Sequence, residues 1–319
     1  MNRRVVSLLV AVAALALPGS AAAAAKHQAP PAPKATVKID VGGLHGGRAQ
    51  IYDTVPVSGT LLPYLPGQRV EVTFYLDGHR LVRHRVAVAK GPGGTGTFSS
   101  SVIVREDGKY AVSAHHAASP QLGADTTVRK SWRVSFPGLH PGECSKVVKG
   151  FKREMAKMGY VAGGGDCFNG RLGREVLAYR KVNGMNRSQK AGPGVVKAVF
   201  GDRGEYRPRY PKAGEHAEVP LAKQVLVLIR KGKPFAVYPV STGKPSTPTI
   251  TGHYSFYRRE PGYNSEGMYY SFYWHNGYAV HGYAEVPDYA ASHGCVRTFI
   301  ADQPRIYDQL EYGESIFVF

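Results

Sequence analysis

Glycine and proline occur at short intervals along this chain, and that spacing constrains its fold more than any other feature of the sequence. The 319 residues include 38 glycines and 22 prolines, residues that interrupt helices and favour tight turns. Many of the segments between them are short and alternate apolar with polar side chains, the pattern of half-buried strands. The sequence therefore predicts a mostly β, multidomain protein with many short strands rather than long helices.

Residues 36–136 show the clearest strand pattern. Turn signals at 76–79, 91–96 and 106–109 separate the alternating segments, and several short strands at this spacing are typical of a β-sandwich. The region lacks a Cys…Trp…Cys pattern and resembles a bacterial immunoglobulin-like module, without any catalytic group of residues. The predicted strands are 36–41, 69–76, 81–88, 97–104, 110–115 and 130–136.

The pattern changes after a linker rich in proline and glycine at 136–142. Residues 146–159 carry apolar side chains at three- and four-residue steps and end on a glycine, which predicts an amphipathic helix. Shorter helices are predicted at 174–182 and 194–200. Residues 142–200 resemble the three-helix peptidoglycan-binding-like module, which implies wall attachment; a structural spacer is the alternative. The resembling residues are Val148, Phe151, Met158, Gly159, Tyr160, Asp166, Phe168, Asn169, Gly170, Val176, Tyr179, Asn183, Gly184 and Met185.

A third domain is predicted at 219–319, where the β pattern returns. Two apolar runs, 224–230 and 235–241, flank a Lys-Gly-Lys-Pro turn and predict a hairpin. A helix is expected at 301–310 and a last strand at 315–319.

The N-terminus predicts export. Arg3 and Arg4 precede a weakly apolar run at 5–17, and alanines at 21–25 offer small-residue cleavage sites. This is the pattern of a secretory signal peptide at 1–25, with an uncleaved anchor helix as the alternative. A Pro/Ala linker follows at 26–35, and no later segment has the length of a membrane span. The protein is expected to be secreted into the cell envelope, either the cell wall or the periplasm.

The formal charge of +18 fits several anionic partners, including nucleic acid, lipid surfaces and an acidic cell envelope, and does not choose among them. The three cysteines are more specific. Cys144 and Cys167 flank one predicted helical unit and would form a disulfide in an exported chain. Cys295 is then the odd cysteine, which indicates a reactive thiol.

Residues 281–297 contain the residue types of thiol chemistry: His281, His293, Cys295 and Arg297. Only a thiolate attacks efficiently, and a histidine can take the thiol proton. Arginine suits a substrate carboxylate. Two other interpretations are a zinc site formed by the two histidines and the cysteine, and a buried structural cysteine. The spacing matches no usual zinc signature, so we expect neither metal nor cofactor.

The motifs HG and SHGC-x-R, preceded by the stretch PVSTGKPSTPTITG at 239–252, resemble the L,D-transpeptidase (YkuD) family over about the last 100 residues. The resemblance implies a β-rich catalytic domain that acts on peptidoglycan stem peptides. A tetrapeptide donor loses its terminal D-alanine, its acyl group passes to the enzyme thiol, and an amine of another stem completes a 3→3 cross-link.

The resemblance also implies roles for individual residues. Cys295 is the nucleophile, and the Gly282 carbonyl or its neighbour orients the ring of His281, the expected general base. His293 helps to hold the oxyanion and the cysteine, although the sequence leaves open which histidine is the base. The N–H groups of Gly294 and Cys295 are the expected oxyanion donors. Ser292 shapes the site, and Arg297 and Tyr283 are the candidate substrate-binding residues.

Three other functions fit parts of this pattern. An L,D-carboxypeptidase would hydrolyse the same peptides, and a wall-binding protein with an inactive catalytic domain would only attach to them. A sortase has no reason to contain the SHGC arrangement. The expected partners are peptidoglycan stem peptides and glycan strands, with no nucleic acid and no stable membrane span; the sequence predicts no oligomeric state.

Overall fold

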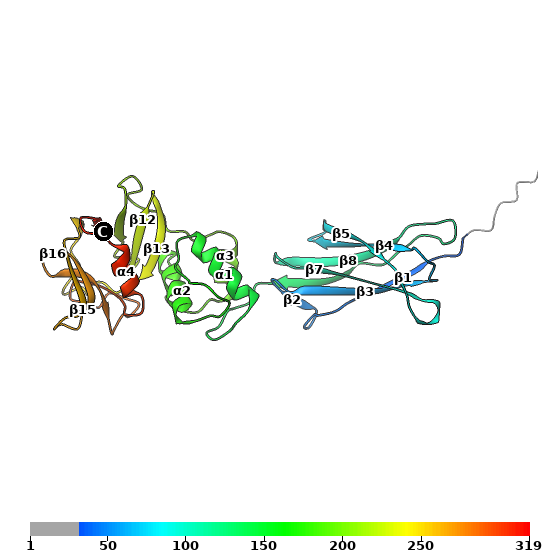
Figure 1. Ribbon diagram of the computed structural model, residues 1–319, viewed down its shortest axis with the longest axis horizontal. Helices are drawn as coiled ribbons and strands as arrows, with labels where there is room; N and C mark the ends of the chain where they lie inside the picture. The colour runs from blue at the N-terminus through cyan, green and yellow to red at the C-terminus, as the bar shows by residue number, and fades with distance from the viewer. Residues whose placement is uncertain (1–31) are drawn as a thin grey trace, which may run out of the picture.

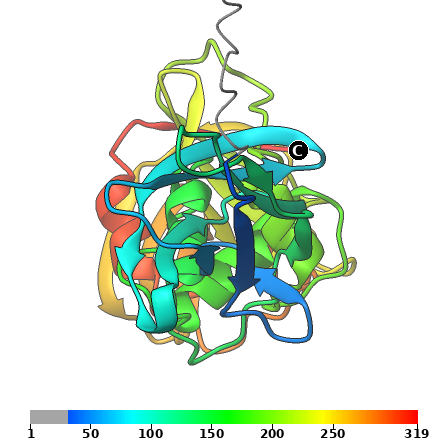
Figure 2. The same ribbon diagram turned by 90° about the vertical axis from the view of Figure 1, so that its right-hand side faces the viewer.

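The computed structural model describes residues 32–319. The predicted signal peptide at 1–25 and most of the linker at 26–35 lie outside the described residues. Two facing β-sheets, a group of helices and a second β-rich part follow one another along the long axis (Figure 1), and the view along that axis shows them one behind another (Figure 2). The prediction of a mostly β protein is confirmed. In the described part, no helix combines the length and the apolarity needed to cross a membrane.

The N-terminal part consists of two sheets with strand orders β1-β3-β7-β6 and β2-β10-β8-β4-β5, with β9 paired to β8. Buried and exposed residues alternate along β1 and β3, so one face of their sheet lies on the core. Strand β3 was not predicted from the sequence, because its alternation includes a proline and a glycine. The elements are β1 (Thr36–Val41), β2 (Arg48–Gln50), β3 (Thr54–Leu62), β4 (Arg69–Leu76), β5 (His79–Ala87), β6 (Ala89–Lys90), the 3₁₀ turn η1 (Pro92–Gly94), β7 (Gly96–Ile103), β8 (Gly108–His116), β9 (Asp125–Thr126) and β10 (Lys130–Ser135).

Three helices follow: α1 (Lys146–Lys157), α2 (Gly170–Val182) and α3 (Pro193–Phe200). Side chains cap the first two, because Ser145 accepts from the N–H of Val148 and Asn169 accepts from that of Leu172. The Asn169 cap explains why α2 begins four residues before the predicted start at 174. The amphipathic pattern read from the sequence is the buried face of α1.

The C-terminal part contains two further sheets, with strand orders β13-β12-β11-β19-β14 and β15-β16-β17-β18. The predicted hairpin and the last helix are present. The elements are β11 (His216–Val219), β12 (Val225–Arg230), β13 (Lys233–Pro239), β14 (Gly252–Ser255), β15 (Arg258–Tyr263), β16 (Tyr269–His275), β17 (Tyr278–Tyr283), β18 (Val296–Phe299), α4 (Gln303–Gln309) and β19 (Ser315–Val318).

Strand β12 lies between two hydrophobic cores. Val225, Val227 and Ile229 belong to the core that includes α1, α2 and α3. The alternate residues Leu226 and Leu228 belong to a second core that lies against the other sheet. A strand that is covered on both faces has apolar side chains at consecutive positions, which explains the QVLVLIR sequence. The three helices and the C-terminal sheets are therefore packed as layers of one body.

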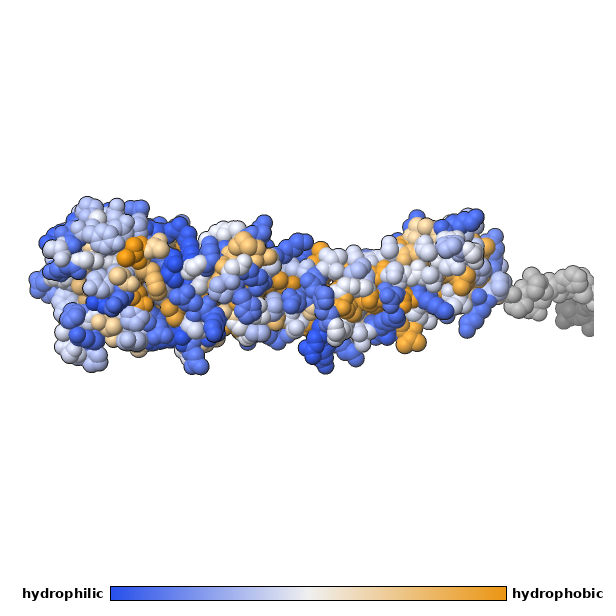
Figure 3. Space-filling view, turned by 90° about the horizontal axis from the view of Figure 1, so that it is seen from below, coloured by the Kyte–Doolittle hydropathy of each residue, from blue (hydrophilic) through white to orange (hydrophobic). Residues whose placement is uncertain are grey.

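One face of the whole molecule is drawn by hydropathy in Figure 3. In the face drawn in Figure 3, hydrophobic residues form small patches separated by hydrophilic ones along the whole length. Scattered apolar residues are normal on a protein surface, so these small patches do not by themselves mark a binding site.

Candidate active site

A pocket of about 250 Å³ brings together most of the residues singled out from the sequence. It lies where β17 and β18 run side by side in parallel, with His281 opposite Arg297 in the register. Cys295 immediately precedes β18, so the pairing places it beside the strand that carries His281. The pocket is lined by Glu266, Met268, His281, Tyr283, Ser292, His293, Cys295 and Arg297.

Cys295 is a partly exposed thiol and is the free cysteine of the described residues. Its Sγ lies 3.5 Å from the carbonyl oxygen of Gly277. Burial raises the pKa of the thiol, and the carboxylate of Glu266 adds to the rise, whereas the N–H of Ala279 and the charge of Arg297 oppose it. The thiol is therefore protonated near neutral pH, and its nucleophilic form requires a base.

His281 is almost completely buried on β17. Its Nδ1 lies 3.0 Å from the carbonyl oxygen of Gly282. A carbonyl can only accept, so Nδ1 carries the hydrogen and Nε2 has the free lone pair. Burial, followed by the nearby charge of Arg297, lowers the pKa of His281 to about 4, although the Gly282 bond acts in the opposite direction. The ring is therefore neutral and able to accept a proton at Nε2.

His293 has a different environment, because it is exposed at the edge of the pocket. The ammonium of Lys244 lies 3.1 Å from its Nε2 and donates to it. The loop that contains Lys244 is bonded along the backbone to the segment before Cys295, through Lys244 N–H to Ser292 O at 2.9 Å. Both histidines line the pocket, but His293 is exposed and bonded to a neighbouring cation, whereas His281 is buried.

The turn before Cys295 is fixed by two hydroxyl groups. Ser292 Oγ donates to the Cys295 carbonyl at 2.6 Å and accepts from the Gly294 N–H at 3.1 Å. Thr249 Oγ1 donates to the Gly294 carbonyl at 2.7 Å. Gly294 has φ +122°, and a Cβ there would lie 2.6 Å from the ring of Tyr278. Both the backbone conformation and the available space require glycine at this position.

Opposite charges line the pocket. The Arg297 guanidinium lies 4.0 Å from the centre of the Tyr283 ring, a cation–π contact that limits its movement. Glu266 lies on the loop between β15 and β16, which Asn264 Oδ1 holds by accepting from the N–H groups of Glu266 and Met268. The site therefore offers a cation and a carboxylate to a substrate in addition to the thiol and the imidazole.

Three contributing residues were missed as site residues in the sequence: Lys244, Thr249 and Glu266. Lys244 and Thr249 lie inside the 239–252 stretch, whose individual residues were given no role. Glu266 lies on a hairpin loop, and nothing in its local pattern indicates that its carboxylate lines a pocket formed by strands distant in the sequence.

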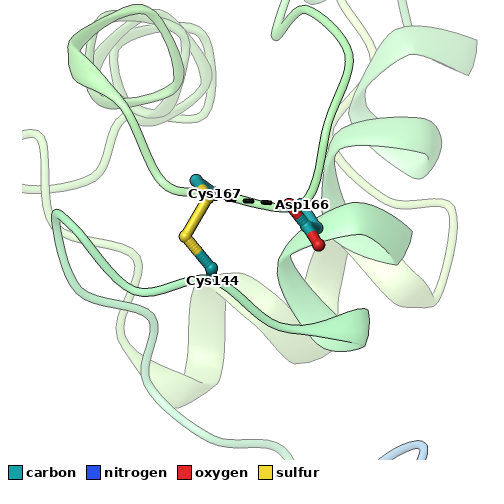
Figure 4. A group of neighbouring side chains, drawn as sticks. All are labelled: Cys144, Asp166 and Cys167. Carbon is teal, nitrogen blue, oxygen red and sulfur yellow. Dashed lines mark hydrogen bonds between the residues drawn. A yellow bond between two sulfur atoms is a disulfide. The ribbon is translucent and has the colours of Figure 1, made fainter.

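The structure joins Cys144 and Cys167 in a disulfide. Figure 4 shows the bond with the carboxylate of Asp166 beside it. These three side chains are close enough to suggest a metal site. Zinc, however, binds deprotonated thiolates, and the two cysteine sulfurs are not thiolates because they are bonded to each other. This group is therefore a covalent link between the segment before α1 and the segment before α2.

The fold and the pocket define a β-rich domain that combines a free thiol and a buried neutral histidine in one pocket of about 250 Å³. Residues 214–318 match the family model of YkuD, the L,D-transpeptidase catalytic domain. This part of the chain is a YkuD L,D-transpeptidase catalytic domain.

Among solved structures, one L,D-transpeptidase shares the fold over part of the chain. The L,D-transpeptidase of Xylanimonas cellulosilytica is 24% identical, covers 57% of this chain and 98% of its own, and superposes with a TM-score of 0.53. The L,D-transpeptidase (Yku) of Stackebrandtia nassauensis is 21% identical over 56% of this chain and 94% of its own, with a TM-score of 0.35. The catalytic domain of the E. faecium L,D-transpeptidase is 24% identical over 33% of this chain and 96% of its own, with a TM-score of 0.30. No curated protein sequence matches the chain.

Proposed function

We propose that this protein is a peptidoglycan L,D-transpeptidase in which Cys295 is the nucleophile and His281 is the general base. The observation that carries the proposal is the presence of both side chains in one pocket, with His281 Nδ1 bound to the Gly282 carbonyl. That bond leaves Nε2 as the proton acceptor. His293 is the weaker candidate for the base because Lys244 donates to its Nε2.

The reaction begins from a neutral thiol and a neutral imidazole. As the Cys295 sulfur attacks the carbonyl carbon of the third stem residue, its proton passes to His281 Nε2. The carbon–nitrogen bond to the terminal D-alanine then breaks, and the proton moves from Nε2 to the departing amine. A thioester remains. A side-chain amine of a second stem attacks it, the sulfur leaves, and the amine proton returns through His281 to the sulfur.

The surrounding residues have complementary roles in this proposal. The N–H of Cys295 donates to the oxyanion, with the Gly294 N–H as the second donor; in the free protein that group is bonded to Ser292 Oγ. Arg297, steadied by Tyr283, binds the carboxylate of the terminal D-alanine. Gly282 supplies the carbonyl that orients His281, and Ser292 holds the turn before the nucleophile.

The other parts of the chain belong to the same proposal. The predicted signal peptide would deliver the protein to the cell envelope. The N-terminal sheets would serve as an immunoglobulin-like spacer (36–136), and the helical unit (142–200) would contact the wall. The Cys144–Cys167 disulfide suits an exported protein.

Mass spectrometry of products tests this function. The mature protein is incubated with a disaccharide-tetrapeptide, beside a Cys295→Ala variant whose folding is checked by circular dichroism. A cross-linked dimer with loss of D-alanine is expected from the wild type, together with an acyl-enzyme adduct on the intact protein. Tripeptide without dimer would identify a carboxypeptidase. The same products from wild type and Cys295→Ala would refute Cys295 as the nucleophile, and no product from the wild type would refute the proposed catalysis.

A further inference from the structure

Strand β16 has a bulge directly opposite His281. In the pairing of β16 with β17, Tyr269 lies opposite Gly282 and Phe272 lies opposite Val280. Tyr270 and Ser271 therefore face the single residue His281, and Tyr270 has the unusual φ of +50°. A bulge interrupts the ladder and leaves a backbone group without its regular partner. The strand beside the proposed base thus needs support from elsewhere.

Gln303 supplies this support. It is the first residue of α4 and is fully buried. Its Nε2 donates to the carbonyl of the bulged residue Tyr270 at 2.6 Å and approaches that of Val280 at 3.4 Å. One side chain therefore connects the bulge to β17 on the residue before His281.

The other end of the amide reaches β18. The Thr298 hydroxyl, also fully buried, lies 2.6 Å from Gln303 Oε1 and 3.1 Å from the His281 carbonyl oxygen. Gln303 also packs against the backbone of Gly282, where an added Cβ would lie 3.0 Å from its own Cβ. The amide is thus bonded or packed against both neighbours of His281 and is linked through Thr298 to its carbonyl.

The helix that carries Gln303 is itself anchored. The preceding residue, Asp302, accepts two bonds from the Arg174 guanidinium of α2, at 2.5 and 2.7 Å. Asp302 is buried, and the Arg174 side chain is only 15% exposed. A bidentate pair in such a position fixes orientation as well as distance. The start of α4 is therefore held by the helical unit, which lies outside residues 214–318.

We propose that Gln303 is a positioning residue of the active site, which holds the bulged strand and both neighbours of His281 so that Nε2 faces Cys295. This inference rests on the proposed role of His281. It concerns placement of the base and not contact with substrate. A displacement of about 1 Å in a reacting group can lower turnover by about 10²-fold.

Gln303→Met tests the inference, because methionine keeps the length of the side chain and removes both polar atoms. The matched control is Gln309→Met on the same helix, where Oε1 accepts from Tyr238 and has no link to β16, β17 or β18. Two measurements are made: kcat and KM with the stem peptide, and the pH dependence of Cys295 alkylation by iodoacetamide.

For Gln303→Met we expect kcat to fall by about 10–100-fold with KM within about twofold, since substrate contacts are untouched. The acid limb of alkylation should move upward from pH 4 towards 6.5, because a loosened His281 is more hydrated. Gln309→Met should keep both properties. A folded Gln303→Met with wild-type kcat and an unchanged acid limb would overturn the inference.

A second variant decides the matter if Gln303→Met does not fold. Thr298→Val keeps the side-chain shape and removes the hydroxyl, so it should move kcat and the acid limb in the same directions by smaller amounts; wild-type values would overturn the inference. If wild-type protein forms no product from stem peptides, the proposed function fails, and the alkylation profiles alone decide the role of Gln303.

Discussion

At pH 7 the side chains of the two residues proposed to react, Cys295 and His281, are both in their neutral forms. Burial raises the pKa of the Cys295 thiol and lowers that of the His281 imidazole to about 4. A preformed thiolate–imidazolium pair is therefore disfavoured, and in the proposed reaction the proton moves as the sulfur attacks. Arg297 acts on both groups, because its charge lowers the pKa of the thiol and of the imidazole alike.

The pH below which the reaction slows, the acid limb of its pH profile, depends on the pKa of the base His281. The base must be neutral, and its pKa is lowered, so kcat/KM should hold down to about pH 4 and fall only below it. Initial rates between pH 3.5 and 8, with iodoacetamide alkylation of Cys295 to separate enzyme from substrate ionisation, provide the measurement. A limb near 6.5 would mean that His281 is not the base or is not buried in solution.

The residues proposed to react could be singled out in the sequence because they lie within one short segment. His281, Cys295 and Arg297 occur within 17 positions, and both motifs of the family are present. The residues proposed to hold them in place could not be identified from the sequence in the same way. Gln303 and Thr298 follow the motif closely, but their role depends on a bulge in β16 that no local pattern reveals.

At the scale of elements, strands with a regular apolar pattern were easier to predict than short or bulged strands. The alternation in β1 and β4 gave strands at the predicted residues, and the apolar hairpin of β12 and β13 was also predicted. β17 and β18 were not assigned, since β17 is a short strand that is buried along most of its length and β18 has only four residues. β16 was read only as an aromatic run, because its bulge breaks the alternation.

The disulfide is expected to stabilise the helical unit. Cys144 and Cys167 are 23 residues apart in sequence, and closing a loop of that length restricts the unfolded chain by roughly 3 kcal/mol. The Cys144→Ser/Cys167→Ser variant should lose about that free energy of unfolding in urea titrations.

Reducing agent provides the control for this prediction. It should destabilise the wild type and leave the double variant unchanged, and thiol labelling of the native wild type should modify Cys295 alone. Labelling at Cys144 and Cys167, or an unchanged unfolding midpoint in the variant, would contradict the prediction.

At the scale of the whole molecule, the helical unit and the C-terminal sheets are joined by polar bonds as well as by the shared core. Lys181 of α2 donates to the Val240 carbonyl at 2.8 Å, and Lys223 donates to the Val182 carbonyl at 2.5 Å. Ser241, which follows Val240, exchanges two backbone bonds with Arg297. The helical unit is therefore connected to the pocket by a short path: Lys181 bonds to Val240, and the next residue, Ser241, bonds to Arg297 in the pocket lining.

Lys181 makes the stability of this junction depend on pH. Burial, followed by the charge of Arg187, lowers its pKa from 10.5 to about 7, although Asp288 opposes the shift. Between those values the unfolded chain holds a proton that the folded chain has lost, so the Lys181 contribution to stability rises with pH, by up to about 1.4 kcal/mol per unit.

Urea unfolding of the wild type and Lys181→Met at pH 7, 8 and 9 measures this dependence. The wild type should gain stability relative to the variant as the pH rises, since methionine does not titrate. A difference that stays constant across the three pH values would show that Lys181 keeps its proton in the folded state.

Strand β12 is covered on both faces, and this limits where recombination could exchange one part of the protein for another. Val225, Val227 and Ile229 would face water if the helices were exchanged for an unrelated partner, whereas Leu226 and Leu228 would remain covered. Burying three such side chains is worth about 1.5–3 kcal/mol each. The helices and the catalytic sheets should therefore be inherited as one block, and a breakpoint between residues 200 and 216 should be selected against.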